Sequence, residues 1–241
     1  MFLFIIILLE QNLFLAFNTF TMIHRFDILT IFPAMIDSYA NESILGRAQK
    51  AKSIEVKAHD LREFTTDKHR KVDDTPYGGG PGMVMKVEPF DLALKKIKKG
   101  KKACIILTAA NGKTFSQADA QRLAKYHQVI FLCGRYEGID QRVEDNLVDE
   151  TFSIGNYVLT GGELPALVMC DAIARNIPGV LGAEASLEKE SHTEEGYLEY
   201  PQYTKPEKYK KWSVPEILLS GDHKKIEVWR EEQSKKKTTL R

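Results

Sequence analysis

The hydrophobic positions of this chain fall into short, nearly continuous apolar runs, which alternate with amphipathic stretches of helical period. Runs rich in Val, Ile, Leu and Phe are typical of strands that are buried on both faces of a parallel sheet. They predict strands at Phe26–Phe32, Ile54–Ala58, Ala103–Leu107 and Val129–Cys133, and further strands at Thr151–Ile154 and Tyr157–Leu159.

The amphipathic stretches predict helices at Pro89–Lys98, Ser116–Tyr126 and Leu164–Asn176. Ser116 is a favourable N-cap residue, and Pro165 suits the first turn of the last helix. Strands that alternate with helices indicate an α/β domain built on a mostly parallel sheet.

The pattern changes beyond the last of these helices. Residues 183–196 are small, polar and acidic, and they predict a flexible linker. Two further helical patterns follow, around Glu207–Trp212 and Lys224–Gln233, and predict a small lysine-rich helical domain. We therefore expect a main domain over 22–182, the linker, and a C-terminal domain over 197–241.

The first 21 residues are almost purely apolar. They lack the basic region of a signal peptide, and Glu10-Gln11-Asn12 interrupts any membrane span. Met22 stands immediately before the first predicted strand. We interpret residues 1–21 as an over-extended start that is not part of the fold, with a membrane tether as the alternative.

The composition narrows the class of protein. A chain of 241 residues with 43% hydrophobic residues can bury a full core. A net charge of +1 excludes a uniformly basic coat for nucleic acid, although the C-terminal lysines can form a local basic face. The three cysteines form no C-x-x-C pair, so we expect buried thiols, no zinc site and a cytoplasmic protein.

Three glycine-bearing loops carry the candidate chemistry. They are Pro76–Met83, Cys133–Asp140 and Tyr157–Pro165. Glycine lets backbone N–H and C=O groups approach a ligand closely, because no Cβ intervenes. The loops predict a nucleotide-like ligand held mainly by main chain, with Arg135, Glu137 and Asp140 as groups that handle the substrate.

Two common nucleotide-binding motifs are absent from the sequence. Asn111-Gly112-Lys113-Thr114 ends like a phosphate-binding loop, but Leu107 occupies the position where that loop requires glycine. No G-x-G-x-x-G follows a predicted strand. These observations argue against an NTPase and against a dinucleotide-dependent dehydrogenase.

The three loops, together with Leu198–Pro206 and Val214–Gly221, resemble those of the bacterial tRNA (guanine-N1)-methyltransferases, the TrmD family of SPOUT methyltransferases. The resemblance runs from Met22 to near Arg241. It implies a trefoil-knotted domain, S-adenosyl-L-methionine as methyl donor, and a homodimer with active sites at its interface. It also implies a tRNA (guanine(37)-N1)-methyltransferase activity, on the guanosine 3′ of the anticodon.

The resemblance further implies which residues bind the donor. Ala109-Ala110-Asn111 stands where the family usually has Ser-Pro-Gln, so we expect main-chain contacts at this segment. The expected donor-binding residues are Thr108, Ala109, Ala110, Gly134, Glu137, Ser153, Ile154, Gly155, Tyr157, Leu159, Gly161 and Gly162.

Methylation of guanine N1 requires that its proton leave, so a carboxylate base and a cation near O6 are needed. The resemblance assigns the base to Glu190, where the family has Asp, and the cation to Arg175. The tRNA contacts that it implies are His69, Arg135, Glu137 and Asp140.

Two alternatives stay open at this point. One keeps the fold but methylates another tRNA or rRNA nucleoside. The other is a catalytically silent RNA-binding protein that still holds the donor, which only the Glu190 replacement favours. The sequence also leaves open whether Mg²⁺ takes part. The chain ends at Arg241, before the closing segment of many relatives, so we expect a shortened C-terminal domain.

Overall fold

The computed structural model describes residues 23–98, 100, 102–182, 190–192 and 197–239. The chain divides after Gly182 into two compact units, and each is described by itself. Residues 1–21 and most of the predicted linker lie outside the described residues.

A five-stranded sheet in the order β2-β1-β6-β5-β7 forms the centre of the first unit, and every neighbouring pair of strands is parallel. The predicted α/β class is therefore confirmed. The strands are β1 (His24–Thr30), β2 (Ile54–Asp60), β5 (Ala103–Thr114), β6 (Gln128–Cys133) and β7 (Glu150–Ser153).

Both faces of the sheet are buried, which explains the continuous apolar runs. Side chains alternate between the faces of a strand. In β6, Val129, Phe131 and Cys133 pack into one hydrophobic core, whereas Ile130 and Leu132 pack into the other.

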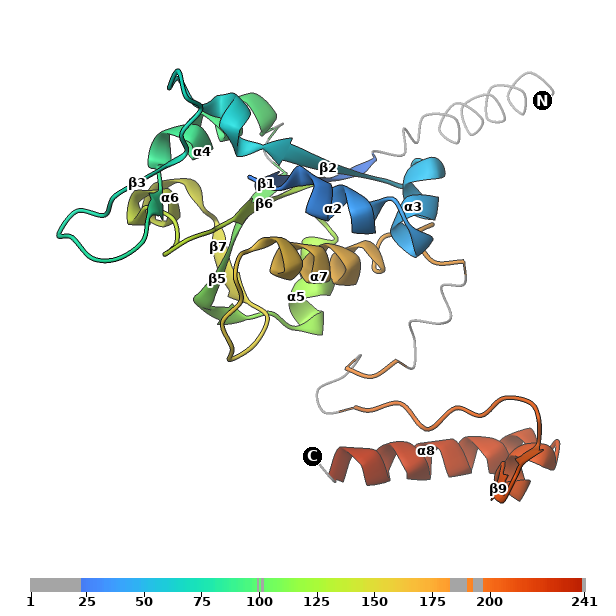
Figure 1. The fold of residues 1–241 in the computed structure, drawn as a ribbon. Helices are drawn as coiled ribbons and strands as arrows, with labels where there is room; N and C mark the ends of the chain where they lie inside the picture. The colour runs from blue at the N-terminus through green and yellow to red at the C-terminus, as the bar shows by residue number, and fades with distance from the viewer. Residues whose placement is uncertain (1–22, 99, 101, 183–189, 193–196, 240–241) are drawn as a thin grey trace, which may run out of the picture. The chain divides into compact units, whose positions relative to one another are not determined.

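Helices cover the sheet in two layers (Figure 1). The first layer contains α2 (Pro33–Ala40), α3 (Ser43–Lys50), α5 (Gln117–Leu123) and α7 (Glu163–Ala174). The second contains the 3₁₀ helix η1 (Leu61–Phe64), α4 (Val87–Ile97) and α6 (Gln141–Leu147). Three predicted helices are confirmed as α4, α5 and α7, while α2, α3 and α6 were not predicted.

The first glycine loop connects a short antiparallel pair, β3 (Asp73–Asp74) and β4 (Val84–Met85). In Figure 1 it projects from the body of the first unit. Its glycines at 78, 79, 80 and 82 all have positive φ, between 75° and 123°. Most of the loop is exposed.

The second unit contains a short hairpin and one long helix. The hairpin pairs Lys208 with Ser213 and Tyr209 with Trp212. The elements are β8 (Lys208–Tyr209), β9 (Trp212–Ser213), the 3₁₀ helix η3 (Glu216–Leu219) and α8 (His223–Thr239). The helix predicted around Lys224–Gln233 is confirmed within α8.

Two predicted elements are wrong. The segment Glu207–Trp212 forms the hairpin instead of a helix, because its side chains are exposed and Lys210 turns the chain at φ 54°. The segment Tyr157–Leu159 is a loop and not a strand. β7 ends at Ser153, Gly155 turns the chain at φ 154°, and the segment's own side chains face solvent.

No helix in the described ranges combines the length and the apolar character that crossing a membrane requires.

Candidate active site

A cleft of about 460 Å³ lies at the carboxyl ends of β6 and β7, beside residues 107–111 of β5. These three strands are neighbours and run parallel, so their ends meet at one edge of the sheet. Ligands of open parallel sheets bind at this edge. Most of the lining comes from four segments, Leu107–Asn111, Gly134–Ile139, Phe152–Ile154 and Tyr157–Gly162.

The cleft brings together every expected donor-binding residue except Gly155. Gly155 instead shapes the loop after β7. Its carbonyl accepts a hydrogen bond from Ser153 Oγ at 2.9 Å and another from the Tyr157 N–H at 2.9 Å. The segments that the sequence separates are therefore adjacent in the fold.

The second and third glycine loops are in direct main-chain contact. The Gly162 N–H donates to the carbonyl of Gly134 at 3.0 Å. A Cβ on Gly162 would collide with the Thr108 hydroxyl and with the backbone of Cys133. Glycine is therefore required at 162 by close approach. The Thr108 hydroxyl itself donates to the carbonyl of Leu132 at 3.1 Å, which holds its side chain in the wall.

The first glycine loop ends beside the second. The Glu137 N–H donates to Met83 O at 3.0 Å, and the Met85 N–H donates to Gly138 O at 2.9 Å. The Asp140 N–H in turn donates to Met85 O at 2.9 Å. All three glycine loops therefore meet at the same edge of the sheet.

Arg135 has mostly internal contacts. Its Nε donates to Glu163 Oε2 at 2.9 Å, its Nη1 donates to the carbonyl of Thr160 at 3.2 Å, and its guanidinium lies 4.7 Å from the centre of the Phe32 ring. Glu163 is fully buried and also accepts from the Thr30 hydroxyl at 2.7 Å. The geometry gives Arg135 a structural role, whereas its expected tRNA contact stays a prediction.

Glu163 was not among the site residues expected from the sequence. The available signal was an acid directly after two glycines, at the start of a helix that is then apolar as far as Cys170. A carboxylate at such a buried position needs a cationic partner, and the partner is Arg135.

The other residues expected to contact tRNA are Asp140, Glu137 and His69, and each has a different environment in the first unit. Asp140 caps α6, and hydrogen bonds from Arg142, including one at 2.6 Å, hold the pKa of the Asp140 carboxyl below its usual value. Glu137 lines the cleft with an exposed side chain. His69 lies in an exposed turn, where its backbone N–H donates to the Asp67 carboxylate at 2.9 Å. It does not line the cleft.

Neither expected catalytic residue, Arg175 or Glu190, is among the residues that line the cleft. Arg175 caps the end of α7 and lines a second cavity of about 320 Å³. Tyr39 and Asp171 line the same cavity and are joined by a 2.7 Å hydrogen bond. Glu190 belongs to the other compact unit, so its approach to the cleft stays a prediction.

Among the residues that the structure describes, no group of three or more His, Cys, Asp and Glu side chains could hold a metal ion. The predicted burial of Cys104, Cys133 and Cys170 is confirmed. Burial raises the pKa of the Cys104 thiol to about 12, so this thiol stays protonated and unreactive.

Comparison with known proteins agrees with this geometry. The model of the family described as tRNA (Guanine-1)-methyltransferase TrmD matches residues 24–241. The chain is 51% identical over 211 residues to the tRNA (guanine-N(1)-)-methyltransferase of Geobacter sulfurreducens, which covers 87% of this chain and 86% of that protein.

Other relatives are similar to the same extent. The protein of the same name from Ruminiclostridium cellulolyticum is 50% identical over 216 residues, covering 89% of this chain and 92% of its own length. That of Staphylococcus carnosus is 49% identical over 209 residues, covering 87% and 85%. The matches extend over nearly the whole chain, including both compact units. This protein therefore belongs to the tRNA (guanine-1)-methyltransferase family.

Proposed function

We propose that this protein transfers a methyl group from S-adenosyl-L-methionine to N1 of the guanosine immediately 3′ of the anticodon in tRNA. The observation that carries the proposal is the cleft beside β5, β6 and β7, which collects the expected donor-binding segments. Membership of the family and relatives named for this chemistry support the choice of reaction.

The cleft fits a nucleoside-sized donor. Its volume of about 460 Å³ lies within the usual range for small-molecule sites. The Gly134 and Gly162 backbones lie against each other in the wall of the cleft, and a Cβ at 162 would force them apart. Ile154 and Leu159 offer apolar surface for an adenine ring, and the exposed Glu137 carboxylate offers an acceptor. When bound, the donor supplies a methyl group that its sulfonium already activates.

The chain's own residues then have to manage one proton and one developing charge. Guanine N1 becomes nucleophilic when Glu190 Oε accepts its proton, and the resulting negative charge spreads onto O6. The guanidinium of Arg175 keeps a fixed positive charge and two donor faces, which suit a contact with O6. The residues that line the cleft would hold the donor and orient it for transfer of its methyl group.

The location of Arg175 supports a dimeric active site. The outer faces of α2 and α7 expose large apolar side chains beside the Arg175 cavity, and the two helices contact each other. Leu164 is 53% exposed and Val168 is 50% exposed on α7. Contiguous apolar surface of this kind marks interaction sites. We take a second copy to cover this face and to bring Arg175 and Glu190 to the partner's cleft.

The proposal also includes the trefoil-knotted backbone that the family resemblance implies, and a cytoplasmic location where tRNA is found.

A methyl-transfer assay tests the reaction. Purified protein, labelled donor and a tRNA with guanosine after the anticodon should give N1-methylguanosine, and a matched tRNA with adenosine at that position should give no label. Equal labelling of both tRNAs would favour another target nucleoside. Tight tRNA binding without any label transfer would favour a silent binding protein. Repeating the assay with a chelator decides whether a divalent ion is needed.

A further inference from the structure

The segment Ala109–Gly112 leaves the β5 strand and returns to it. Thr108 pairs with Phe152 of β7, and Lys113 pairs with the same Phe152. Four residues are therefore looped out opposite one partner residue. The side of this bulge that faces outward contributes Ala109, Ala110 and Asn111 to the wall of the cleft. Its exact path therefore sets the position of main-chain groups in the wall.

The return point of the bulge is tightly packed. A Cβ on Gly112 would lie 2.7 Å from the Phe152 carbonyl carbon and 2.8 Å from that of Thr151. Beyond it, the Phe115 N–H donates to Ser153 O at 2.8 Å. The backbone at this point has little room to shift without moving β7.

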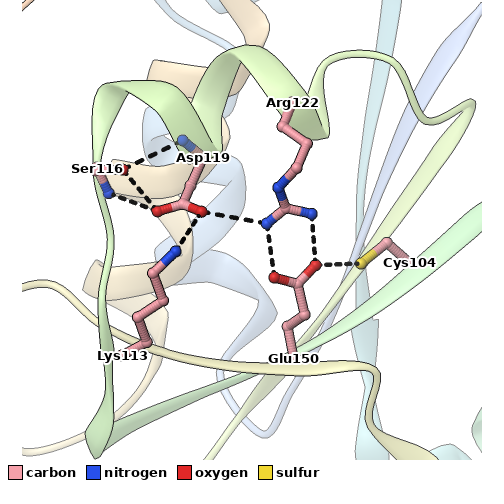
Figure 2. A network of polar contacts seen from close by, with 6 residues as sticks. All are labelled: Cys104, Lys113, Ser116, Asp119, Arg122 and Glu150. Carbon is pink, nitrogen blue, oxygen red and sulfur yellow. Dashed lines mark hydrogen bonds and ion pairs between the residues drawn. The ribbon is translucent and has the colours of Figure 1, made fainter.

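A polar network contacts Lys113, the residue at which the bulge returns to the strand (Figure 2). Lys113 Nζ donates to Asp119 Oδ1 at 2.8 Å. The same Asp119 oxygen accepts from Arg122 Nη2 at 3.2 Å. Arg122 also forms a two-point pair with Glu150, at 2.8 and 2.6 Å. The network thus runs from β5 through α5 to the start of β7, and it ties helix α5 to both strands that flank the bulge.

The charges of this network are matched. Burial opposes the ionisation of Asp119, but hydrogen bonds from Lys113, Ser116 and Arg122 outweigh it and keep the pKa of the carboxyl below its usual value. The Asp119 side chain is 5% exposed, whereas that of Lys113 is 66% exposed. Lys113 Nζ also lies 5.6 Å from the centre of the Phe152 ring.

Because Lys113 is exposed, its effect on the position of the bulge can be measured apart from any effect on the stability of the fold. An ion pair with so exposed a partner adds little to the free energy of unfolding. It can nevertheless help to fix the geometry of the bulge, because it ties Lys113, the residue at which the chain pairs with β7 again, to a buried carboxylate of α5. Asp119 is less useful as a probe, since it also forms the capping box of α5 with Ser116.

We propose that Lys113 is a positioning residue of the methyl-transfer site, which fixes the 109–112 bulge through its pair with Asp119 and so sets the main chain that meets the donor. This inference rests on the proposed function in one respect, the identity of the donor. It assigns no contact between Lys113 and the donor itself.

The test compares Lys113→Met with a matched control, Lys95→Met. Lys95 forms a similar pair with Asp91 at 2.6 Å and is 69% exposed, but it lies on α4, away from the bulge. Two quantities are measured for each full-length variant. One is the dissociation constant of S-adenosylhomocysteine by calorimetry, and the other is the hydrogen exchange of the 109–112 amides in protein without ligand.

Lys113→Met should weaken binding about fivefold, since about 1 kcal/mol is the upper range for an exposed ion pair and tenfold corresponds to about 1.4 kcal/mol. Exchange at 109–112 should accelerate, while the melting temperature and tRNA affinity match those of Lys95→Met. Lys113→Arg should restore both readouts.

Unchanged exchange and unchanged affinity in Lys113→Met would overturn the inference. A loss that Lys95→Met reproduces would also overturn it, because the effect would then be a general one of surface charge. If the unaltered protein failed to bind the probe, the proposed function would be contradicted. The exchange measurement would then still decide whether Lys113 positions the bulge.

Discussion

Arg135 and Glu163 form an ion pair in which a single carboxylate oxygen, Oε2, lies 2.9 Å from both Nε and Nη2 of the guanidinium. Their side chains are 15% and 1% exposed. The pair joins the second glycine loop to the helix that follows the third. The second and third glycine loops, which both line the cleft, are therefore held to each other by side chains as well as by main chain.

Removal of the Glu163 charge should destabilise the protein. In Glu163→Gln the buried guanidinium loses its counter-charge, and breaking a buried pair typically costs about 3 kcal/mol or more. Urea unfolding measures the loss. The control is Glu55→Gln, in which a half-exposed carboxylate 3.6 Å from Arg25 is removed; we expect a change within about 0.5 kcal/mol. Equal changes in both variants would contradict a special role for the buried pair.

Gly162→Ala should open the cleft wall. The added methyl group would collide with Thr108 and Cys133, so the second and third loops must separate. We expect a loss of about 1–3 kcal/mol in the free energy of unfolding, the usual cost of overpacking, together with weaker donor binding. Gly182→Ala is the control, because no atom lies within 4 Å of its Cβ position. Thermal unfolding and calorimetry on both variants check the prediction, and a tolerated Gly162→Ala would refute the close approach.

Glu190→Gln should abolish turnover while donor affinity stays unchanged, because an amide cannot accept the N1 proton. Loss of a general base typically lowers the rate about 10²–10⁴-fold. Single-turnover methylation measures this rate. Glu190→Asp should retain activity, and Glu188→Gln, a neighbouring acid of the same segment, should be neutral. Full activity of Glu190→Gln would remove this residue from the mechanism.

Val168→Asp should disrupt the proposed dimer. It places a charge in the apolar face of α7, where Val168 is 50% exposed, and a charge buried without a partner at an interface is strongly unfavourable. We expect monomers by light scattering and loss of methyl transfer. The control is Val228→Asp, which changes a valine that is 57% exposed on α8 of the other unit. This variant should keep the dimeric mass in light scattering. A dimeric Val168→Asp protein would exclude this face as the interface.

Asp27 should give the stability a dependence on acid pH. Its side chain is fully buried; burial opposes ionisation, but hydrogen bonds from His59, Arg25 and Gln128 prevail and lower the pKa of the carboxyl. The folded pKa is therefore below the unfolded one. The stabilisation is complete above the unfolded pKa, near 3.8, and is lost as pH falls through the folded value. Asp27→Asn should be less stable at pH 7 and should flatten this acid limb in urea titrations from pH 2 to 6. An unchanged limb would assign it to other carboxylates.

The buried strands could be predicted because their side chains are apolar on both faces, as in Val129–Cys133 of β6. The helices that were not predicted, α2, α3 and α6, have no comparable apolar run in their sequences. α6 buries only Val143, and α2 buries only Ile36 and Ala40, so neither carries an apolar stripe that periodicity would reveal. α3 starts at Ser43 with φ 49°, a conformation that local sequence preferences do not predict.

The glycine loops that line the candidate cleft were predicted from the sequence, whereas the side-chain contacts that support these loops were not. Glycines after strands indicated where backbone approaches a ligand. Glu163 lies 28 residues after Arg135 and 133 residues after Thr30, so only the fold brings the three together. The bulge of β5 depends on register with β7, which is a property of two strands and cannot be deduced from one.

The glycines in the lining of the cleft have a consequence for inhibition. A compound that replaced the proposed donor would meet peptide groups at Gly134, Gly161 and Gly162, and a point mutation cannot delete a peptide group. At Gly162 a larger residue would damage the wall itself. Resistance to a compound that relies on these groups should therefore arise at exposed side chains of the lining, such as Glu137 and Tyr157, or through increased production of the protein.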